Sequence, residues 1–298
     1  MTMGKLAFQN PLLLASGCAS FGEPFEDFFD LSIVGAIVTK AITAEPRAGN
    51  APVRIAETPC GMLNAIGLQN PGVEAFAGTV LPKLREKGAK ILVNVAGHSE
   101  SEYASVVKRL AGEPGILGFE VNMSCPNVEN GMMFATDVKL FKELCGLLRS
   151  ETSLPLIPKL SPSAGSLIPY AQAALAAGMD GVTVSNTHPG MAIDWRTGKS
   201  KLSRMSGGLS GPAIKPITLY NVWQVTQAVP ELPVIASGGA ASAMDIIELV
   251  RAGAIAVELG TMLFHDPKLP QRILAELPPL IAQCGATSLQ ALRSTISA

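Results

Sequence analysis

Short apolar runs alternate with amphipathic segments along the chain, and this alternation restricts the possible folds more than any other feature. Each run ends in glycine or polar residues and is almost continuously apolar, as in parallel strands that are covered on both faces. The eight apolar runs are 11–17, 33–40, 91–97, 116–124, 156–161, 181–186, 234–239 and 254–260. The predicted helical segments between and after them are 25–31, 73–87, 100–111, 137–149, 164–177, 213–229, 241–251 and 267–284.

Eight strand–helix units in series predict an α/β fold, a (β/α)8 TIM barrel, in one domain spanning residues 1–298. A doubly wound open sheet is the alternative, but the number of units and the absence of Gly-x-Gly-x-x-Gly after any run disfavour it. Two connections, about 41–72 and 186–212, are too long for simple loops. In a barrel both lie on the C-terminal face, where we expect them to cover a pocket. The second should contain a hairpin that turns at Thr197-Gly198.

Composition excludes several functional classes. Hydrophobic residues make up 48% of the chain and charged residues 16%, which is typical of a globular enzyme. The net charge of −1 predicts no nucleic-acid partner and no anionic membrane surface. The sequence shows no signal peptide and no apolar run of ~18 residues, so we expect a cytoplasmic protein with no membrane contact. Five scattered cysteines and three separated histidines predict reduced thiols and no metal site.

The segment Asn122-Met-Ser-Cys125-Pro-Asn127 closes one of the predicted strands and carries the most chemistry. It places two amides, a hydroxyl and a thiol at a strand end. A thiol there can take a proton from a substrate if its pKa lies near the working pH, and the amides can donate to a flat, oxygen-rich ligand. The alternative is a free cysteine that only packs in the core.

Polar residues also stand at the other predicted strand ends. Lysines occupy two of these positions, Lys40 and Lys159, and buried lysines are rare unless they are paired. Either one alone could extend to solvent. The remaining strand-end residues include Ser16, Ala41, Asn94, Ser185, Asn186 and Thr187. In the first long connection, Asn64 is flanked by apolar residues, so its amide either points inward or satisfies its own turn.

Glycines at the last two strand ends predict a phosphate site. Gly238-Gly239 follows the seventh run and Gly260-Thr261 the eighth. The loops after these two strands are the usual phosphate site of such barrels, and bare amides at a helix N-terminus suit a phosphate. The segment from Gly207 to Gly211 could add further amides. Together these glycines favour a phosphorylated ligand, such as a mononucleotide cofactor.

This set of motifs resembles the dihydroorotate dehydrogenases from about residue 12 to 264. The matching segments are Thr39-Lys40-Ala41-Ile-Thr, Asn64-Ala-Ile-Gly-Leu68-Gln-Asn-Pro-Gly72, Asn122-Met-Ser-Cys125-Pro-Asn127, Lys159-Leu-Ser, Ser185-Asn186-Thr187, Gly207-Gly-Leu-Ser-Gly-Pro-Ala213 and Gly260-Thr261. The cysteine in the catalytic loop makes the sequence resemble class 1, the soluble class, because the membrane-associated class has serine at this position. The run Pro46-Arg-Ala-Gly-Asn50 and Val128 after Cys-Pro-Asn look most like subclass 1B.

The resemblance implies oxidation of dihydroorotate to orotate in pyrimidine biosynthesis, with one non-covalent FMN per chain. Cys125 would be the general base, and Lys40 would touch both flavin and substrate. The substrate would be held by Lys40, Asn64, Ala65, Ile66, Gly67, Leu68, Asn122, Asn186 and Thr187. The FMN would be held by Ser16, Lys40, Ala41, Asn94, Asn122, Lys159, Ser185, Gly211, Gly238, Gly239, Gly260 and Thr261.

Subclass 1B implies partners. The catalytic chain would form a homodimer joined to an electron-transfer subunit with FAD and an iron–sulfur cluster, a heterotetramer that passes electrons to NAD. Three alternatives stay open: the fumarate-dependent class 1A enzyme, a flavoprotein similar to dihydropyrimidine dehydrogenase, and a non-catalytic flavin-binding scaffold. The second usually depends on iron–sulfur clusters, whose Cys-x2-Cys-x2-Cys run is absent from this sequence.

Overall fold

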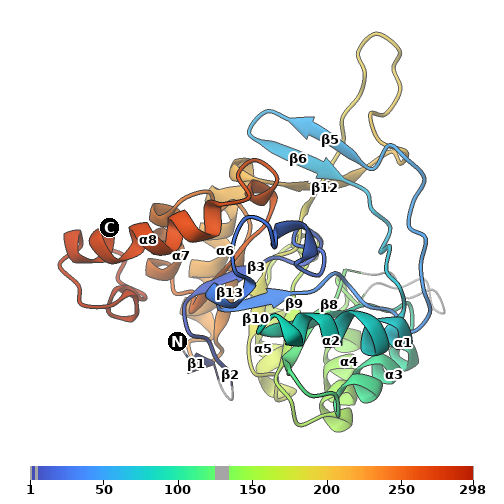
Figure 1. Ribbon diagram of the computed structural model, residues 1–298, viewed down its shortest axis with the longest axis horizontal. Helices are drawn as coiled ribbons and strands as arrows, with labels where there is room; N and C mark the ends of the chain where they lie inside the picture. Colours follow the sequence, from blue (N-terminus) through green and yellow to red (C-terminus); the bar gives the residue numbers. More distant parts are fainter. Residues whose placement is uncertain (1, 4–5, 125–133, 298) are drawn as a thin grey trace.

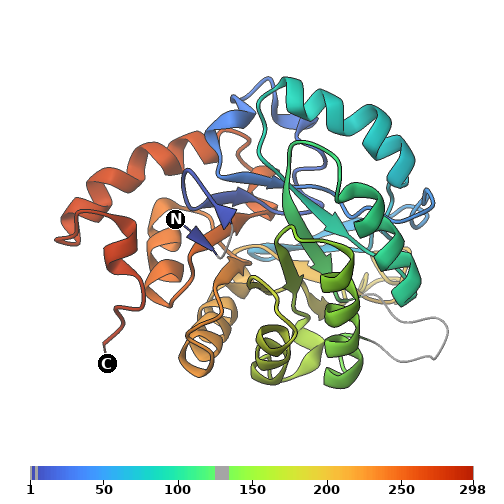
Figure 2. The same ribbon diagram turned by 90° about the horizontal axis from the view of Figure 1, so that it is seen from below.

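Eight parallel strands close into a barrel in the computed structural model, which describes residues 2–3, 6–124 and 134–297. Around the barrel the strands follow their order in the chain, and Figure 2 shows helices surrounding them. The strands are β3 (Leu12–Leu14), β4 (Ala36–Val38), β7 (Ile91–Val95), β8 (Ile116–Asn122), β9 (Leu156–Lys159), β10 (Val182–Val184), β13 (Val234–Ser237) and β14 (Ala256–Leu259). Each lies inside one of the eight predicted runs, so the (β/α)8 barrel is confirmed.

Alternate side chains of each strand face opposite sides of the barrel wall. In β3, Leu13 belongs to a small apolar cluster inside the barrel, whereas Leu12 and Leu14 pack in the larger cluster under the helices. All three are completely buried. A strand that is buried on both faces has no polar alternation, and this is why the runs read as continuously apolar in the sequence.

The surrounding helices agree with seven of the eight predicted segments. They are α1 (Val73–Ala75) continued by a π-helical turn η3 (Phe76–Val80) and α2 (Leu81–Glu86), then α3 (Glu100–Leu110), α4 (Val138–Glu151), α5 (Ile168–Ala176), α6 (Lys215–Ala228), α7 (Ala243–Arg251) and α8 (Leu269–Gln283). Ser99, Asp137 and Ser242 cap α3, α4 and α7 by accepting amide hydrogen bonds with their side chains.

The predicted helix at 25–31 is wrong. Two separate 3-10 turns, η1 (Glu23–Phe25) and η2 (Leu31–Ile33), occupy this region. The side chain of Asp30 accepts a hydrogen bond from the amide of Ser32, which starts the second turn and competes with a continuous helix. A helix of seven residues is only marginally stable, even where no side chain competes for its backbone amides.

The two long connections meet in a small sheet above the barrel (Figure 1). The first contributes β5 (Ile55–Thr58) and β6 (Gly61–Asn64), and the second contributes β11 (His188–Gly190) and β12 (Gly207–Ser210). The order is β11-β12-β6-β5, with antiparallel neighbours. We call these four strands the cover sheet.

The segment between β11 and β12 extends away from the barrel (Figure 1). The amide of Asp194 donates to the carbonyl of Lys199 at 2.8 Å, and a single antiparallel bridge joins Ile193 to Ser200. The chain therefore turns back where the hairpin was predicted, but the bridge is too short to form two strands. In the described part of the chain, no helix combines the length and the apolar character that a membrane span requires.

Candidate active site

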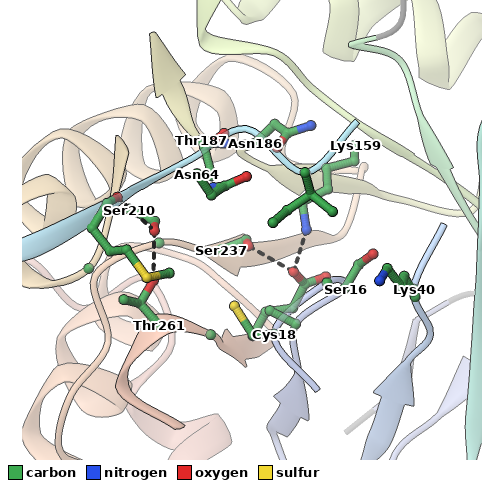
Figure 3. A pocket seen from close by; sticks show the side chains of 18 of the residues that line it. Ser16, Cys18, Lys40, Asn64, Lys159, Asn186, Thr187, Ser210, Ser237 and Thr261 are labelled. Atoms are coloured by element: carbon green, nitrogen blue, oxygen red, sulfur yellow. Dashed lines mark hydrogen bonds and ion pairs between the residues drawn. The ribbon is translucent and has the colours of Figure 1, made fainter. Parts of the chain in front are cut away.

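A cavity of about 320 Å³ lies between the C-terminal ends of the barrel strands and the cover sheet. Its size is within the range of small-molecule sites. Figure 3 shows side chains that point into it from opposite sides, with Lys40 and Lys159 on one side and Thr261 and Ser210 on another. Residues at or just after the ends of all eight barrel strands line it, together with Asn64 and Met62 of the cover sheet.

Most residues that the sequence predicts for the site line this one cavity. They are Ser16, Lys40, Ala41, Asn64, Ile66, Leu68, Asn94, Asn122, Lys159, Ser185, Asn186, Thr187, Gly211, Gly238, Gly239, Gly260 and Thr261. Ala65 and Gly67 do not line it: the amide of Ala65 donates to the carbonyl of Arg54, which precedes β5, and Gly67 packs against Asn50. Cys125, the predicted base, lies outside the described residues.

The floor of the cavity is a buried ionic network centred on Lys159. Its ammonium Nζ lies 2.6 Å from Oε2 of Glu258 and 3.4 Å from Oε1 of Glu120. Lys159 is 6% exposed, Glu120 1% and Glu258 2%, so all three ionisable groups are shielded from water. Buried charges require partners of this kind, because an isolated one is very costly to desolvate.

Hydroxyl and amide donors complete the network. Glu120 accepts from Asn94 Nδ2 at 2.7 Å and from Thr183 Oγ1 at 2.8 Å, and Glu258 accepts from Ser237 Oγ at 2.7 Å. Two atoms of this floor, Asn94 Oδ1 and Glu258 Oε1, are buried and accept no hydrogen bond from the described residues. Because Asn94 lines the cavity, we expect a ligand to satisfy its Oδ1, whereas the carboxyl group of Glu258 is hydrogen-bonded to that of Glu120.

The pKa values of the two carboxylates are shifted in opposite directions. Burial disfavours the charge of Glu120, but the ammonium of Lys159 and the hydrogen bonds to the carboxylate outweigh burial, so its pKa is lowered. Burial and the negative charge of Glu120 raise the pKa of Glu258 to about 8. Burial opposes the charge of Lys159, but the two carboxylates raise its pKa above the ordinary lysine value.

Sequence reasoning missed both glutamates. Each is a single acidic residue within an apolar run, Phe119-Glu120-Val121 in β8 and Val257-Glu258-Leu259 in β14. A carboxylate at such a position must find a cation or a donor, and this requirement was the available signal. Pairing the two glutamates with Lys159 also requires the order of the strands around the closed barrel.

Three amides of the predicted substrate site are held by protein hydrogen bonds. Nδ2 of Asn186 donates to Oδ1 of Asn122 at 3.1 Å and to Oγ of Ser124 at 2.8 Å. Oδ1 of Asn186 accepts from the amide of Thr187 at 2.8 Å. In the cover sheet, Nδ2 of Asn64 donates to the carbonyl of Gly208 at 3.2 Å. These bonds orient the amides before a ligand arrives, which lowers the entropic cost of binding.

Two cations stand near the mouth of the cavity. Lys40 is half-buried, and its pKa is lowered by burial and by the charge of Arg54, with a smaller opposite effect from Glu23. Arg54 also lines the cavity and donates to Oε1 of Gln69 at 2.6 Å. The pair makes the mouth attractive to an anionic ligand such as a carboxylate. Arg54 was not identified from the sequence, because it lies in the irregular part of the first long connection.

Two of the glycines predicted to hold a phosphate are required by their backbone geometry. Gly238 and Gly239 have φ of +131° and +87°, in the region that favours glycine. A Cβ at Gly239 would lie 2.5 Å from the backbone nitrogen of Lys215. Among the described residues, no acceptor is bonded to the amide nitrogen of Gly239. A free amide at the mouth of a parallel barrel, ahead of the N-terminus of α7, fits a phosphate.

We expect Gly239→Ala to lose about 1–3 kcal/mol of unfolding free energy, because the new Cβ clashes with Lys215 and the backbone must stay in a strained region. It should also weaken FMN binding by about tenfold or more, which corresponds to ~1.4 kcal/mol. Urea denaturation and flavin titration measure the two effects. Gly165→Ala is the control, since Gly165 has φ of +73° but no atom near its Cβ position. Equal FMN affinity in the two variants would contradict a phosphate site at Gly239.

The chain matches the family model described as dihydroorotate dehydrogenase over residues 1–281. It is 45% identical over 288 residues to the dihydroorotate dehydrogenase B (NAD(+)), catalytic subunit, of Geotalea daltonii, which covers 96% of this chain and 94% of the relative. The protein of the same name from Anoxybacillus flavithermus is 46% identical over 281 residues, or 94% of this chain and 90% of the relative.

A solved structure confirms the fold at lower sequence similarity. The crystal structure of DHODH in complex with ferulenol from Eimeria tenella superimposes with a TM-score of 0.80 at 23% identity, covering 98% of this chain and 86% of that one. At this identity the likeness supports the barrel architecture and nothing more. The family model and the relatives with more than 40% identity over almost the whole chain show that this protein belongs to the dihydroorotate dehydrogenase family.

Proposed function

We propose that this protein is the catalytic subunit of an NAD-linked dihydroorotate dehydrogenase, which oxidises (S)-dihydroorotate to orotate in pyrimidine biosynthesis. One observation carries the proposal: two lysines and the amides of Asn64, Asn122 and Asn186 line a single cavity at the barrel mouth. Dihydroorotate is a partly saturated pyrimidine ring with carbonyl and amide groups and a carboxylate, and it needs amide partners and a cation. The names of the relatives support the same activity.

We propose that the cavity binds one non-covalent FMN. The unsatisfied Oδ1 of Asn94, the ammonium of Lys159 and the bare glycine segments at 238–239 and 260–261 match the polar ring edge and the phosphate of such a cofactor. When bound, FMN would accept the hydride that leaves the substrate. Lys159 would then place positive charge next to the ring edge that becomes negative on reduction.

The chain's own residues would hold the substrate and take its proton. Asn64, Asn122 and Asn186 with Thr187 would fix the ring by hydrogen bonds. Cys125 would accept the proton from the ring carbon beside the carbonyl, a role that rests on the family resemblance.

We also propose the partners that subclass 1B implies. The relatives are named as catalytic subunits of an NAD(+) enzyme, and this favours an NAD-linked complex over fumarate-dependent turnover by this chain alone. The complex would be a heterotetramer of a homodimer of this chain with subunits carrying FAD and an iron–sulfur cluster. The cytoplasmic location stays a prediction from the sequence.

An anaerobic mixture of the purified, FMN-loaded chain with dihydroorotate tests the proposal. Loss of the oxidised flavin absorbance and formation of orotate in equal amounts are expected. Dihydrouracil is the control substrate, since it lacks the carboxylate that Lys40 and Arg54 would attract. Faster bleaching by dihydrouracil would favour a dihydropyrimidine dehydrogenase, and bound flavin without bleaching by either compound would favour a scaffold. Reoxidation by fumarate would indicate class 1A.

A further inference from the structure

The cavity floor contains one ammonium group and two carboxylates that share it. Glu120 of β8 and Glu258 of β14 approach Lys159 of β9 from different strands. If both carboxylates were ionised, the three groups would carry a net charge of −1 in a site shielded from water. Two carboxylates that share one buried partner seldom both ionise, because each disfavours the charge of the other. One of them should therefore hold a proton at neutral pH.

Hydrogen bonding identifies Glu258 as the proton holder. Both oxygens of Glu120 accept hydrogen bonds, Oε1 from Asn94 and Lys159 and Oε2 from Thr183, which favours the ionised form. Glu258 has both of its donors on Oε2, from Lys159 at 2.6 Å and Ser237 at 2.7 Å. Its Oε1 is buried and accepts no hydrogen bond from the described residues. Burial and the charge of Glu120 raise its pKa to about 8, in agreement with this geometry.

The proton of Glu258 is placed toward Glu120, because a hydrogen bond between the two carboxyl groups raises the pKa of Glu258 and lowers that of Glu120. The titratable groups that face it are Glu120, Lys159 and Cys18, whose thiol is kept neutral because burial raises its pKa to about 12. The neighbouring strand β13 contributes only the hydroxyl of Ser237. Glu258 itself lines the cavity, and its Oε2 lies 2.6 Å from Nζ of Lys159.

We propose that Glu258 is a proton-carrying positioning residue that fixes Lys159 beneath the cofactor and, as a neutral acid, donates its O–H to Glu120 at the floor of the cavity. This inference rests on the proposed binding of FMN. The neutral acid leaves the positive charge of Lys159 balanced only by Glu120. Ionisation of Glu258 removes the donor and adds a negative charge beside the place where reduction also adds one.

Coupling between this proton and the electrons follows from electrostatics. A hydride adds two electrons and one proton to the flavin, so the ring gains negative charge and Glu258 binds its own proton more tightly. Glu258 therefore has a higher pKa when the flavin is reduced than when it is oxidised. At a pH between these two values, reduction of the flavin is accompanied by the uptake of one additional proton from solvent. The reduction equilibrium then shifts by an additional factor of up to ten per pH unit, which is about 30 mV for a two-electron couple.

The test is an electrochemical titration of the bound flavin from about pH 6.5 to 9.5, a range that brackets the titration of Glu258. In the wild type, the flavin potential should show the additional dependence of about 30 mV per pH unit in a window near the pKa of Glu258. Glu258→Gln should lack this additional slope, because the amide keeps a donor and an acceptor but cannot ionise. Glu276→Gln, the same change on the surface of α8, should behave like the wild type. Identical slopes in wild type and Glu258→Gln would overturn the proposal.

Glu120→Gln tests which glutamate carries the proton. With Glu120 neutral, Lys159 would pair with Glu258 alone and the repulsion between the carboxylates would be gone. Glu258 should then ionise more easily, so the window of additional slope should move to lower pH. Loss of the window in this variant, with the window retained in Glu258→Gln, would assign the proton to Glu120 instead and overturn the proposal.

Infrared spectroscopy of the wild type keeps the proposal testable if the variants fold poorly. The neutral acid should give the carbonyl stretch of a protonated carboxyl group at pH 6.5, and the band should disappear as the pH rises toward about 9.5. The apo-protein can be used, so failure to bind flavin would refute the proposed cofactor and leave the infrared result intact. If the wild type showed no band of a protonated carboxyl group at either pH, the proposed role of Glu258 would be refuted and the proposed binding of FMN would be unaffected.

Discussion

Replacement of Cys125 by serine is expected to leave FMN and orotate binding intact and to slow the reduction of the flavin by dihydroorotate by about 10²–10⁴-fold. The two side chains are nearly isosteric, but a hydroxyl is far less acidic than a thiol and gives no useful base at neutral pH. Anaerobic stopped-flow measurement of flavin bleaching gives the rate, and titration with orotate gives the binding.

Cys18→Ser is the matched control, because the thiol of Cys18 lines the cavity. Burial raises its pKa to about 12, so it stays protonated and makes a poor base. The rate in this variant should remain within a few-fold of the wild type. If Cys18→Ser lost the larger part of the rate and Cys125→Ser kept it, the base would have to be reassigned to Cys18.

The barrel could be predicted because its information is local. A buried parallel strand needs an apolar run of a few residues, and Gly178 and Gly253 mark the ends of α5 and α7 with positive φ. The cover sheet could not be predicted in this way. Its central pairing joins Asn64 to Gly208 across 144 residues, and the burial of β5 alternates only weakly. Such pairing depends on where the barrel places the two connections, which no local pattern encodes.

The site shows the same division. Residues at strand ends, such as Asn94 and Lys159, could be predicted because the C-terminal ends of parallel strands meet at one rim. The partners of Lys159 lie inside strands that are 39 and 99 residues away in the chain. Their meeting follows from strand order and register around the closed barrel, and so it became visible only in the structure.

Replacement of Lys159 by methionine should have the largest effect on stability. Without the ammonium, Glu120 and Glu258 remain buried and lose their common cation. Breaking a buried pair in this way costs ~3–5 kcal/mol of unfolding free energy. Urea denaturation of the apo-protein at about pH 8 should show this loss, since both carboxylates are ionised in the unfolded chain at that pH.

The size of the loss should depend on pH in a direction set by the two carboxylates. The lowered pKa of Glu120 means that its ionised form stabilises the wild type above the unfolded pKa, and that this contribution is lost as the pH falls through the folded pKa. The raised pKa of Glu258 acts in the opposite direction, because its contribution is present below the unfolded pKa and is lost as the pH rises toward about 8. In the variant, both folded pKa values should rise, so folding takes up protons and becomes less favourable as the pH increases. The difference between wild type and variant should therefore be smaller at about pH 5 than at pH 8.

Lys215→Met provides the comparison for this prediction. Lys215 also bridges two carboxylates, Asp245 at 2.6 Å and Glu248 at 2.9 Å, but its side chain is 27% exposed. Water replaces the lost partner there, so we expect a cost of about 1 kcal/mol or less. If both variants lost the same small amount at pH 8, the carboxylates around Lys159 would have to be neutral or hydrated. The charged floor of the cavity, and with it the positive group proposed to face the reduced flavin, would then be wrong.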